Sequence, residues 1–142
     1  MKNIPERIKD FINEHHVLTL ATSRDNVPYC ASCFYVYSDR FNVFVFSSDE
    51  GTKHVGDVKI NDRVAGTVVL ETSVSGKIRG IQFTGRMYVP EGDIKKEIER
   101  LYLERYPFAR LMNIRLWVLE PDFIKMTDNR LGFGKKLIWK KK

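Results

Sequence analysis

Three β-rich segments near the N-terminus follow one another with only short turns between them. They cover residues 17–23, 29–38 and 41–48, and Asp, Asn and Pro residues occupy the first link. Turns of this composition join antiparallel neighbours, whereas parallel strands need a crossover of about a dozen residues or more. The sequence therefore predicts an antiparallel meander at the start of the fold.

The remaining segments add strands without alternating them with helices. Residues 64–71 and 78–89 have strand composition, and residues 114–128 contain one or two further strands. Gly80 and Gly85 interrupt the middle segment, which is typical of a bulge or a close backbone approach. We expect a mainly β fold, an antiparallel barrel of six to seven strands with flanking α-helices packed outside it, rather than a parallel Rossmann-type sheet.

Helical spacing predicts three helices around this barrel. The first covers residues 4–15, and its apolar positions are Ile4, Ile8, Phe11 and Ile12. Thr52 is expected to cap a short second helix with Val55 and Val58 facing inward. Asp93 is expected to cap a third, which Pro107 ends and whose apolar stripe contains Ile94, Ile98, Leu101 and Tyr102.

Composition limits the class of protein. The chain has 142 residues, of which 43% are hydrophobic and 30% charged, which suits one globular domain over residues 1–142. No apolar run approaches the roughly 20 residues of a membrane span. The first residues are too charged for a signal peptide, so we expect a cytoplasmic protein with no membrane partner.

Cysteines and histidines offer little sign of a metal site. Cys30 and Cys33 lie in an expected strand, where residues three apart point to opposite faces, so we expect two buried free cysteines and no bound metal. His15 and His16 end the first helix, where a cation complements the helix dipole. His54 is a candidate ligand contact or proton donor, and the alternative is a solvated helix residue. No Ser-His-Asp set or paired carboxylates identify catalytic residues.

The C-terminal segment "TDNRLGFGKKLIW", residues 127–139, combines two glycines, two lysines and a tryptophan. One interpretation is a final strand whose Trp139 packs on the core while the lysines stay in solvent. The other is a segment that bends at its glycines and brings Lys135 and Lys136 to an anionic ligand, with Trp139 holding it by burial. The lysine-rich end suits an anionic partner, but no nucleic-acid-binding module accompanies it, so nucleic acid is not expected.

The order of these segments resembles a known family. A helix, a three-stranded meander, "SSDEGTKH", "NDRVAGTV" and "IRGIQFTGR" are similar to the FMN-binding split barrel of the pyridoxamine 5′-phosphate oxidase superfamily, and "FIKMTDNRLGFGKKLIW" resembles its bacterial YhbP-like branch. The resemblance implies a split β-barrel that forms a homodimer, with FMN in a groove between protomers.

The resemblance also implies where the cofactor binds. The FMN phosphate would meet the third strand's end and the following helix start, with His54 beside them, at Ser47, Ser48, Thr52 and Lys53. The flavin ring would lie against Ala31, Ser32 and Cys33 and against the fifth strand, where Gln82 offers a donor and an acceptor. On the second interpretation of the C-terminal segment, Lys135 and Lys136 would return toward an anionic ligand in the partner's groove, while Trp139 holds the segment by burial.

Departures from the oxidases change the expected activity. Ala31 stands where the oxidases carry a phosphate-contacting arginine, and their C-terminal arginine and histidine are absent. We therefore do not expect pyridoxamine phosphate oxidase activity. The expected function is FMN binding, with a flavin-dependent oxidoreductase acting on a small substrate as one hypothesis. The alternative is a non-catalytic binder of FMN, haem or another planar anionic ligand.

Overall fold

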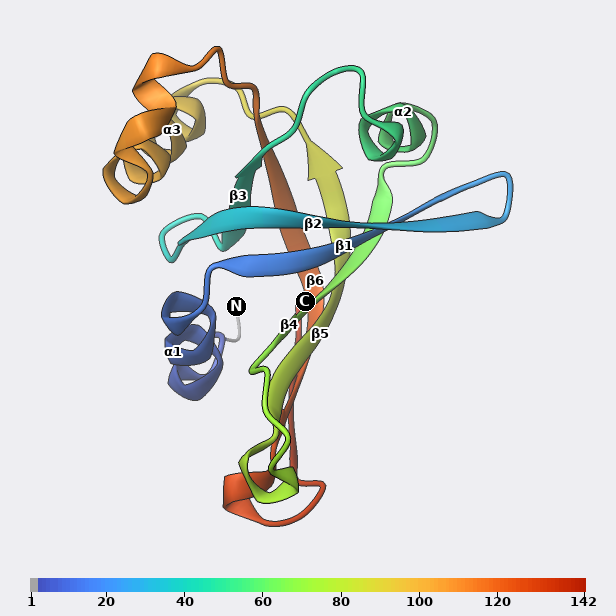
Figure 1. The fold of residues 1–142 in the computed structure, drawn as a ribbon, viewed down its shortest axis with the longest axis vertical. Coiled ribbons are helices and arrows are strands. Elements are labelled where there is room, and N and C mark those ends of the chain that lie inside the picture. Colours follow the sequence, from blue (N-terminus) through green and yellow to red (C-terminus); the bar gives the residue numbers. More distant parts are fainter. Residues whose placement is uncertain (1–2) are drawn as a thin grey trace.

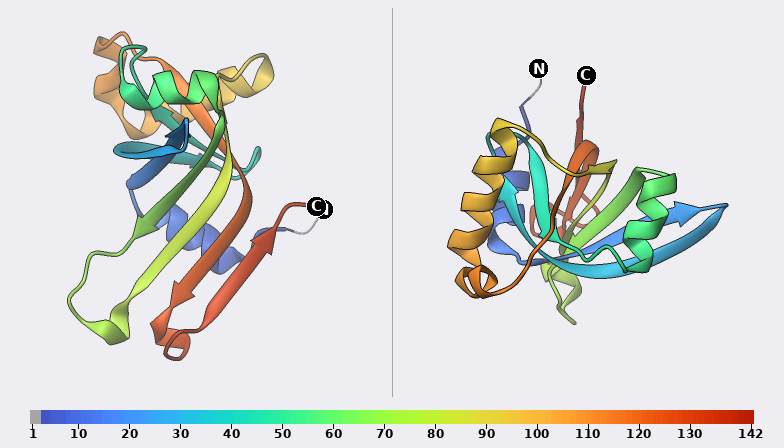
Figure 2. Two further views of the ribbon diagram at one scale, coloured as in Figure 1. Left: turned by 90° about the vertical axis from the view of Figure 1, so that its right-hand side faces the viewer. Right: turned by 90° about the horizontal axis from the view of Figure 1, so that it is seen from above.

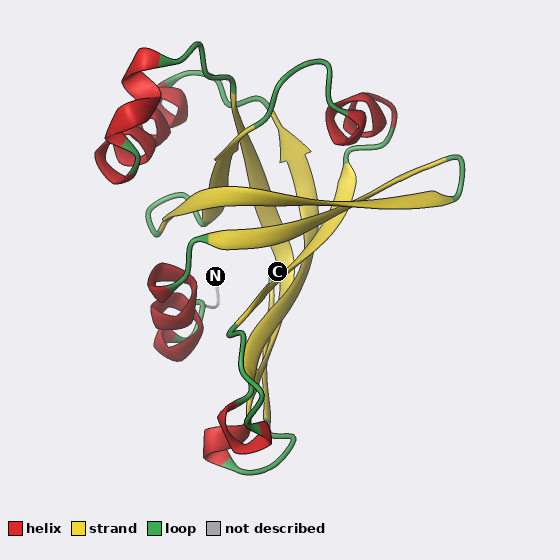
Figure 3. Cartoon of the chain, in the orientation of Figure 1, coloured by secondary structure: helices red, strands yellow, loops and turns green. Residues whose placement is uncertain are grey.

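The computed structural model describes residues 3–142, and its strands form one antiparallel sheet of seven in the order β3-β2-β1-β4-β5-β6-β7. Figure 3 shows these strands at the centre, with the helices around them. The predicted mainly β fold and the meander are confirmed. The strands are β1 (Val17–Arg24), β2 (Val27–Ser38), β3 (Val43–Ser47), β4 (Arg63–Val69), β5 (Arg79–Tyr88), β6 (Leu116–Asp128) and β7 (Lys136–Lys140).

Two different strands share one edge of β6, and this closes the sheet into a ring. Residues 116–119 of β6 pair with β3, whereas residues 123–127 pair with β7. The opposite edge of β6 pairs with β5 along most of its length. The ring is therefore closed over only four residues of β6 and continues beyond them as an open flap, consistent with a split barrel.

Gly85 makes that long β5–β6 pairing possible. The register shifts between Thr84 and Gly85, as the glycine predicted. A Cβ at Gly85 would overlap the Glu120 carbonyl oxygen and lie 3.0 Å from the Cα of Pro121. The two backbones therefore approach more closely here than any other residue would allow.

The core lies inside the ring. Phe44 of β3 and Phe83 of β5 stack with their ring centroids 4.5 Å apart, and both are buried. A second apolar cluster lies on the outer face of β2, β3 and β6, where Val43 and Val45 pack with Ile98 and Tyr102. Strand β3 is thus buried on both faces, which explains why its sequence, "VFVFS", is almost continuously apolar.

Three helices surround the ring, as Figures 1 and 2 show: α1 (Glu6–Glu14), α2 (Lys53–Ile60) and α3 (Asp93–Arg105). The predicted cap of α2 is confirmed, because the Thr52 hydroxyl accepts a hydrogen bond from the Val55 amide at 3.4 Å. The predicted cap of α3 is wrong. Gly92 occupies the N-cap position with φ 68°, a conformation that favours glycine, and Asp93 is the first helical residue.

The β1–β2 hairpin extends from the ring as an arm, which projects to the right in Figure 1. Asp25 and Asn26 form its turn with φ values of 52° and 64°, as a two-residue hairpin of this handedness requires. Residues 24–30 are exposed on both faces of the hairpin. We call residues 24–30 the hairpin arm.

Candidate functional site

The start of α2 carries the residues predicted to meet a phosphate. The Thr52 hydroxyl donates to the Asp49 carbonyl at 2.8 Å, and this fixes the turn that leads from β3 into the helix. The first turn of α2 contains no acidic side chain, so no carboxylate in that turn offsets the positive end of the helix dipole. Unpaired amides at a helix start favour an anion.

Lys53 is held in place beside this helix start. Its ammonium contacts both carboxylate oxygens of Asp57, at 3.1 and 3.0 Å, and lies 4.8 Å from the centroid of the Tyr29 ring on the hairpin arm. Asp57 is buried and also accepts a hydrogen bond from Thr22 at 3.0 Å. The bonds from Lys53, and then that from Thr22, hold the pKa of Asp57 below its usual range. Lys53 itself remains half-exposed.

Ser48, His54 and Cys33 form a second, buried group behind the helix start. A hydrogen bond of 2.8 Å joins His54 Nε2 and Ser48 Oγ. Burial raises the pKa of the Cys33 thiol to about 11, and a hydrogen bond with Ser48 offsets only part of that rise. Burial also lowers the pKa of His54. At neutral pH this group is therefore uncharged, with a protonated thiol and a neutral imidazole.

The two cysteines point to opposite faces of β2, as predicted, but only one of them is buried. Cys33 lies in the core, whereas Cys30 is exposed on the hairpin arm. The prediction of two buried cysteines is wrong for Cys30, because the arm extends beyond the body that buries the rest of β2. Among residues 3–142 no group of three or more His, Cys, Asp or Glu side chains could hold a metal ion.

The residues predicted to face a flavin ring lie on two different faces. Ser32 pairs with Thr19, Thr19 with Thr67, and Thr67 with Gln82, so Ser32 and Gln82 end a row that crosses four strands. Successive strands lie about 4.8 Å apart, so three spacings separate these side chains by roughly 14 Å. Cys33 faces the core instead, and half-buried Ala31 shares its face of β2. One protomer therefore does not bring Ser32 and Gln82 into contact.

The C-terminal segment forms a short 3₁₀ turn, Asn129–Leu131, and the strand β7. Gly132 and Gly134 adopt φ values of 135° and 74°, so the chain bends at both glycines as predicted. Trp139 packs in the core and Lys135 remains exposed, while Lys136 donates to the Thr127 hydroxyl at 3.2 Å. Figures 1 and 2 place this turn and α2 at opposite ends of the long axis, so Ser47, Thr52 and the tail lysines do not meet within one protomer.

A cavity of about 490 Å³ lies between α3, the segment after it and the start of β6. Its wall includes Glu50 from the turn before α2, so it adjoins the helix start described above. Trp117 lines the cavity, and its buried indole Nε1 has no hydrogen-bond partner within residues 3–142. Size and a mixed apolar and charged wall are typical of small-molecule pockets.

Sequence reasoning missed the side chains that anchor Lys53. The spacing of Lys53 and Asp57, four residues apart on a helix, could have indicated an ion pair. Thr22 is 35 residues from Asp57, and only the packing of α2 against β1 brings the two together.

No helix in the described part of the chain is long and apolar enough to cross a membrane.

Comparison with known proteins decides the family. Residues 4–127 match the family described as pyridoxamine 5′-phosphate oxidase. The chain belongs to that family. Within it, a protein of Klebsiella pneumoniae strain 342, named only as a UPF0306 protein, is 40% identical over 131 residues, which cover 92% of this chain and 89% of that one.

Solved structures share the fold at low sequence identity. A haem-binding protein from Mycobacterium smegmatis superimposes with a TM-score of 0.78 at 17% identity, covering 96% of this chain and 59% of that protein. An FAD-binding protein from Mycobacterium smegmatis gives a TM-score of 0.71 at 17% identity and covers 87% and 94%. Likeness at this level establishes the ring architecture but not the ligand.

Proposed function

We propose that the protein is a homodimer that binds FMN, with the flavin phosphate at the start of α2. The observation that carries the proposal is Lys53, a half-exposed cation fixed by buried Asp57 at a helix start without an acidic first turn. A fixed cation beside free amides attracts a phosphate with little further loss of side-chain entropy. Lysine has three donors, so Lys53 can contact a phosphate while it remains bonded to Asp57.

The hairpin arm supports the homodimer. Val27 and Tyr29 lie on it, and Phe34 follows it on β2 with 62% of its surface exposed. A partner that covered these apolar side chains would gain about 25 cal/mol for each Å² removed from water. The separation of Ser32 from Gln82 within one protomer also favours a groove completed by a second copy.

Haem is the rival ligand, because relatives of this fold include a haem-binding protein. Haem iron commonly takes an axial histidine. In the described part of the chain, His54 is buried against Ser48, His15 bonds to the Phe11 carbonyl at 2.9 Å, and His16 contacts Arg105. The contacts of His15 and His16 are made by Nδ1, and an imidazole bonded at one ring nitrogen can bind a metal through the other, so the histidines do not decide between haem and flavin.

When bound, FMN would supply hydride and electron transfer, and this chain would orient it. Lys53 and the amides at the start of α2 would hold the phosphate, and the cap formed by Thr52 would fix that helix start. Neutral His54 could position a hydroxyl or carbonyl group near it. Oxidation of a small substrate is the finer hypothesis, and turnover with reduced nicotinamide or a small donor would test it.

Cofactor identification on freshly purified protein tests the proposal. We expect a yellow protein that releases FMN on denaturation, and a haem Soret band instead would overturn the choice of ligand. Titration of the cofactor-free protein with FMN and with riboflavin then isolates the phosphate. FMN should bind more tightly than riboflavin, and equal affinities would remove the phosphate from the site.

A second measurement tests the dimer. Val27→Glu places a charge on the hairpin arm, and we expect a monomer by light scattering together with weaker FMN binding. Val74 is similarly exposed but lies in the loop before β5, so Val74→Glu is the matched control. A Val27→Glu protein that stays dimeric and binds FMN normally would exclude the arm from the interface.

A further inference from the structure

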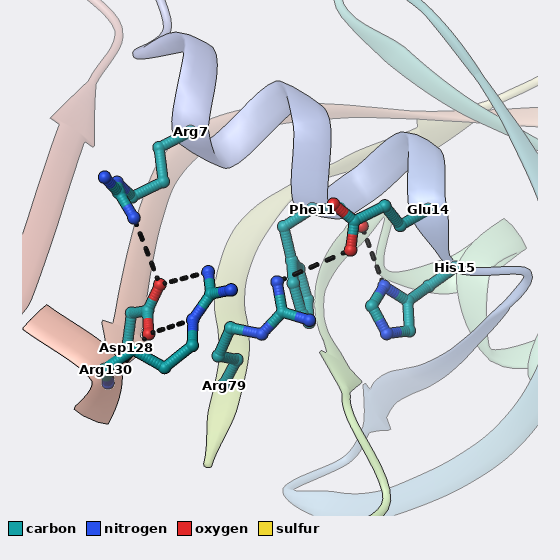
Figure 4. A network of polar contacts seen from close by, with 7 residues as sticks. All are labelled: Arg7, Phe11, Glu14, His15, Arg79, Asp128 and Arg130. Atoms are coloured by element: carbon teal, nitrogen blue, oxygen red, sulfur yellow. Dashed lines mark hydrogen bonds and ion pairs between the residues drawn. The ribbon is translucent and has the colours of Figure 1, made fainter. Parts of the chain in front are cut away.

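A cluster of arginines and carboxylates joins α1 to the C-terminal tail, at a distance from α2. Figure 4 shows Arg7, Glu14, Arg79, Asp128 and Arg130 on α1, β5, β6 and the turn after β6. All of these except Asp128 line a cavity of about 330 Å³, whose wall is formed by Arg7, Asp10, Phe11, Glu14, Arg79 and Arg130. This volume is close to the lower limit of small-molecule pockets, about 300 Å³.

Asp128 is already saturated by two of the three arginines. Its Oδ1 accepts from the backbone amide and the Nε of Arg130, both at 3.0 Å. Its Oδ2 accepts from Arg130 Nη2 at 2.9 Å and from Arg7 Nη1 at 3.5 Å. One buried carboxylate therefore serves two guanidinium groups, and it has no capacity left for Arg79.

Arg79 has hydrogen-bond donors that lack a close acceptor. Its Nη1 reaches Glu14 Oε2 at 3.4 Å, which is long for an N–H···O bond. Its Nε is buried and has no partner among the described residues. The guanidinium carbon lies 5.5 Å from the centroid of the Phe11 ring, and the ring partly shields the charge from water.

Charge around the cavity favours an anion. Arg7 and Arg130 share one carboxylate, and Arg79 has only the loose contact with Glu14. Asp10 also lines the wall and is exposed, and Arg7 and Arg130 are half-exposed, so solvent screens the charges of all three. Arg79, with 15% of its side chain exposed, is the least screened of the arginines. In Figure 4 the guanidinium groups of Arg79 and Arg130 lie next to each other with no carboxylate between them, and both line the same cavity.

We propose that this cavity binds an oxyanion group of a small molecule, a phosphate or a carboxylate, between Arg79 and Arg130. The planar forks of two arginines suit either group, because each can donate two parallel hydrogen bonds. The bound group would replace Glu14 as the acceptor for Arg79. It would also link α1 to the tail, so ligand binding and the docking of both segments are coupled.

The site is independent of the proposed flavin site, and the test keeps the two apart. We would follow the melting temperature of the full chain in inorganic phosphate and, separately, in acetate, with sodium chloride holding ionic strength constant. At about ten times the dissociation constant the melting temperature should rise by roughly 5 °C. The probe that acts at lower concentration identifies the preferred oxyanion, and no shift with either probe would overturn the proposal.

Arg79→Gln should weaken binding of the effective probe at least about tenfold. Arg86→Gln is the matched control, because Arg86 lies on the same strand and contacts Asp62 at the same 3.4 Å but is 63% exposed. FMN binding by Arg79→Gln should be unchanged, which separates this site from the flavin site. Equal effects of the two substitutions on probe affinity would contradict the assignment.

Glu14→Gln provides a test of opposite sign. Removing the competing carboxylate frees Arg79, so affinity for the probe should increase severalfold. If the ion pair of Arg79 with Glu14 were only structural, its loss would lower the stability of the fold without increasing affinity for the probe. The gain decides the question even if Arg79→Gln fails to fold, and unchanged or weaker binding by Glu14→Gln would reject the proposal.

Discussion

Lys53 and Asp57 lie one helical turn apart on α2, and the ammonium contacts both oxygens of the carboxylate. Asp57 is 2% exposed, so its charge must have a partner, and Lys53 supplies it. The lysine is thereby fixed at the helix start instead of moving freely in solvent. A structural ion pair and a phosphate contact can thus use the same side chain.

Replacing Lys53 should separate these two roles. We expect Lys53→Ala to lower FMN affinity about 10- to 100-fold, because a hydrogen bond to a charged group contributes roughly 1.5–3 kcal/mol. Riboflavin affinity should change little, since riboflavin lacks the phosphate. Lys59→Ala, on the same helix with its contact to Glu50, is the control, and calorimetric titration is the measurement. An equal loss of FMN and riboflavin binding would indicate general damage to the site.

Asp128 should make stability depend on acid pH. Its hydrogen bonds with Arg130 lower the pKa of its carboxyl to about 2, against roughly 3.9 in an unfolded chain. A lowered folded-state pKa stabilises the protein above the unfolded value, and this contribution disappears as pH falls from about 4 towards 2. We expect Asp128→Asn to lose about 2 kcal/mol of unfolding free energy at neutral pH and to show a shallower acid decline.

Denaturant unfolding at several pH values measures that effect. Other paired carboxylates also titrate in acid, so the informative quantity is the difference between the wild-type and variant slopes. Asp39→Asn, at an exposed position, controls for the loss of one negative charge. Parallel slopes for the wild type and Asp128→Asn would show that Asp128 does not contribute in this way.

Gly85 should tolerate no side chain. In Gly85→Ala the added Cβ would overlap the Glu120 carbonyl and force β5 and β6 apart, so we expect a loss of about 1–3 kcal/mol or more. Gly51→Ala is the control, since its Cβ would meet no atom within 4 Å, and its effect should stay within about 0.5 kcal/mol. Thermal or urea unfolding compares the two, and similar losses would disprove the close approach.

The two cysteines should differ sharply in reactivity. Cys30 is exposed on the hairpin arm, whereas Cys33 is buried and its thiol pKa is raised to about 11. Because the thiolate is the reactive form, a maleimide should label Cys30 in the native protein and Cys33 only after unfolding. Mass spectrometry of Cys30→Ser and Cys33→Ser variants locates the label. Rapid native labelling of Cys33 would mean that its surroundings open readily.

Several local features could be predicted because they depend on nearby residues alone. The hydroxyl of Thr52 and the φ freedom of Gly132 and Gly134 act within a few positions of the chain, and the structure confirms them. Asp93 shows the limit of such reasoning. An aspartate suits an N-cap, but Gly92 adopts the backbone conformation that the approach to α3 requires. The helix therefore starts at Asp93, one residue earlier than a cap at Asp93 would place it.

Long-range features could not be predicted in the same way. The exposure of Cys30 depends on how far the β1–β2 hairpin extends beyond the ring, and the residues near Cys30 do not predict that distance. The contact of Thr22 with Asp57 requires α2 to cross β1. Likewise, Arg7 and Asp128 are 121 positions apart and meet only because α1 and the end of β6 lie side by side.

By itself, the sequence determined the strand and helix segments and most of their inward faces, because hydrophobic spacing and turn residues act locally. It also indicated Lys53 and the helix start after β3 as candidate contacts for a phosphate group. Only the tertiary structure decided which charges are paired, which cysteine is reachable and where arginines from distant segments surround a cavity. Burial and electrostatic pairing depend on distances through space, and those distances arise only when the ring closes through β3 and β6.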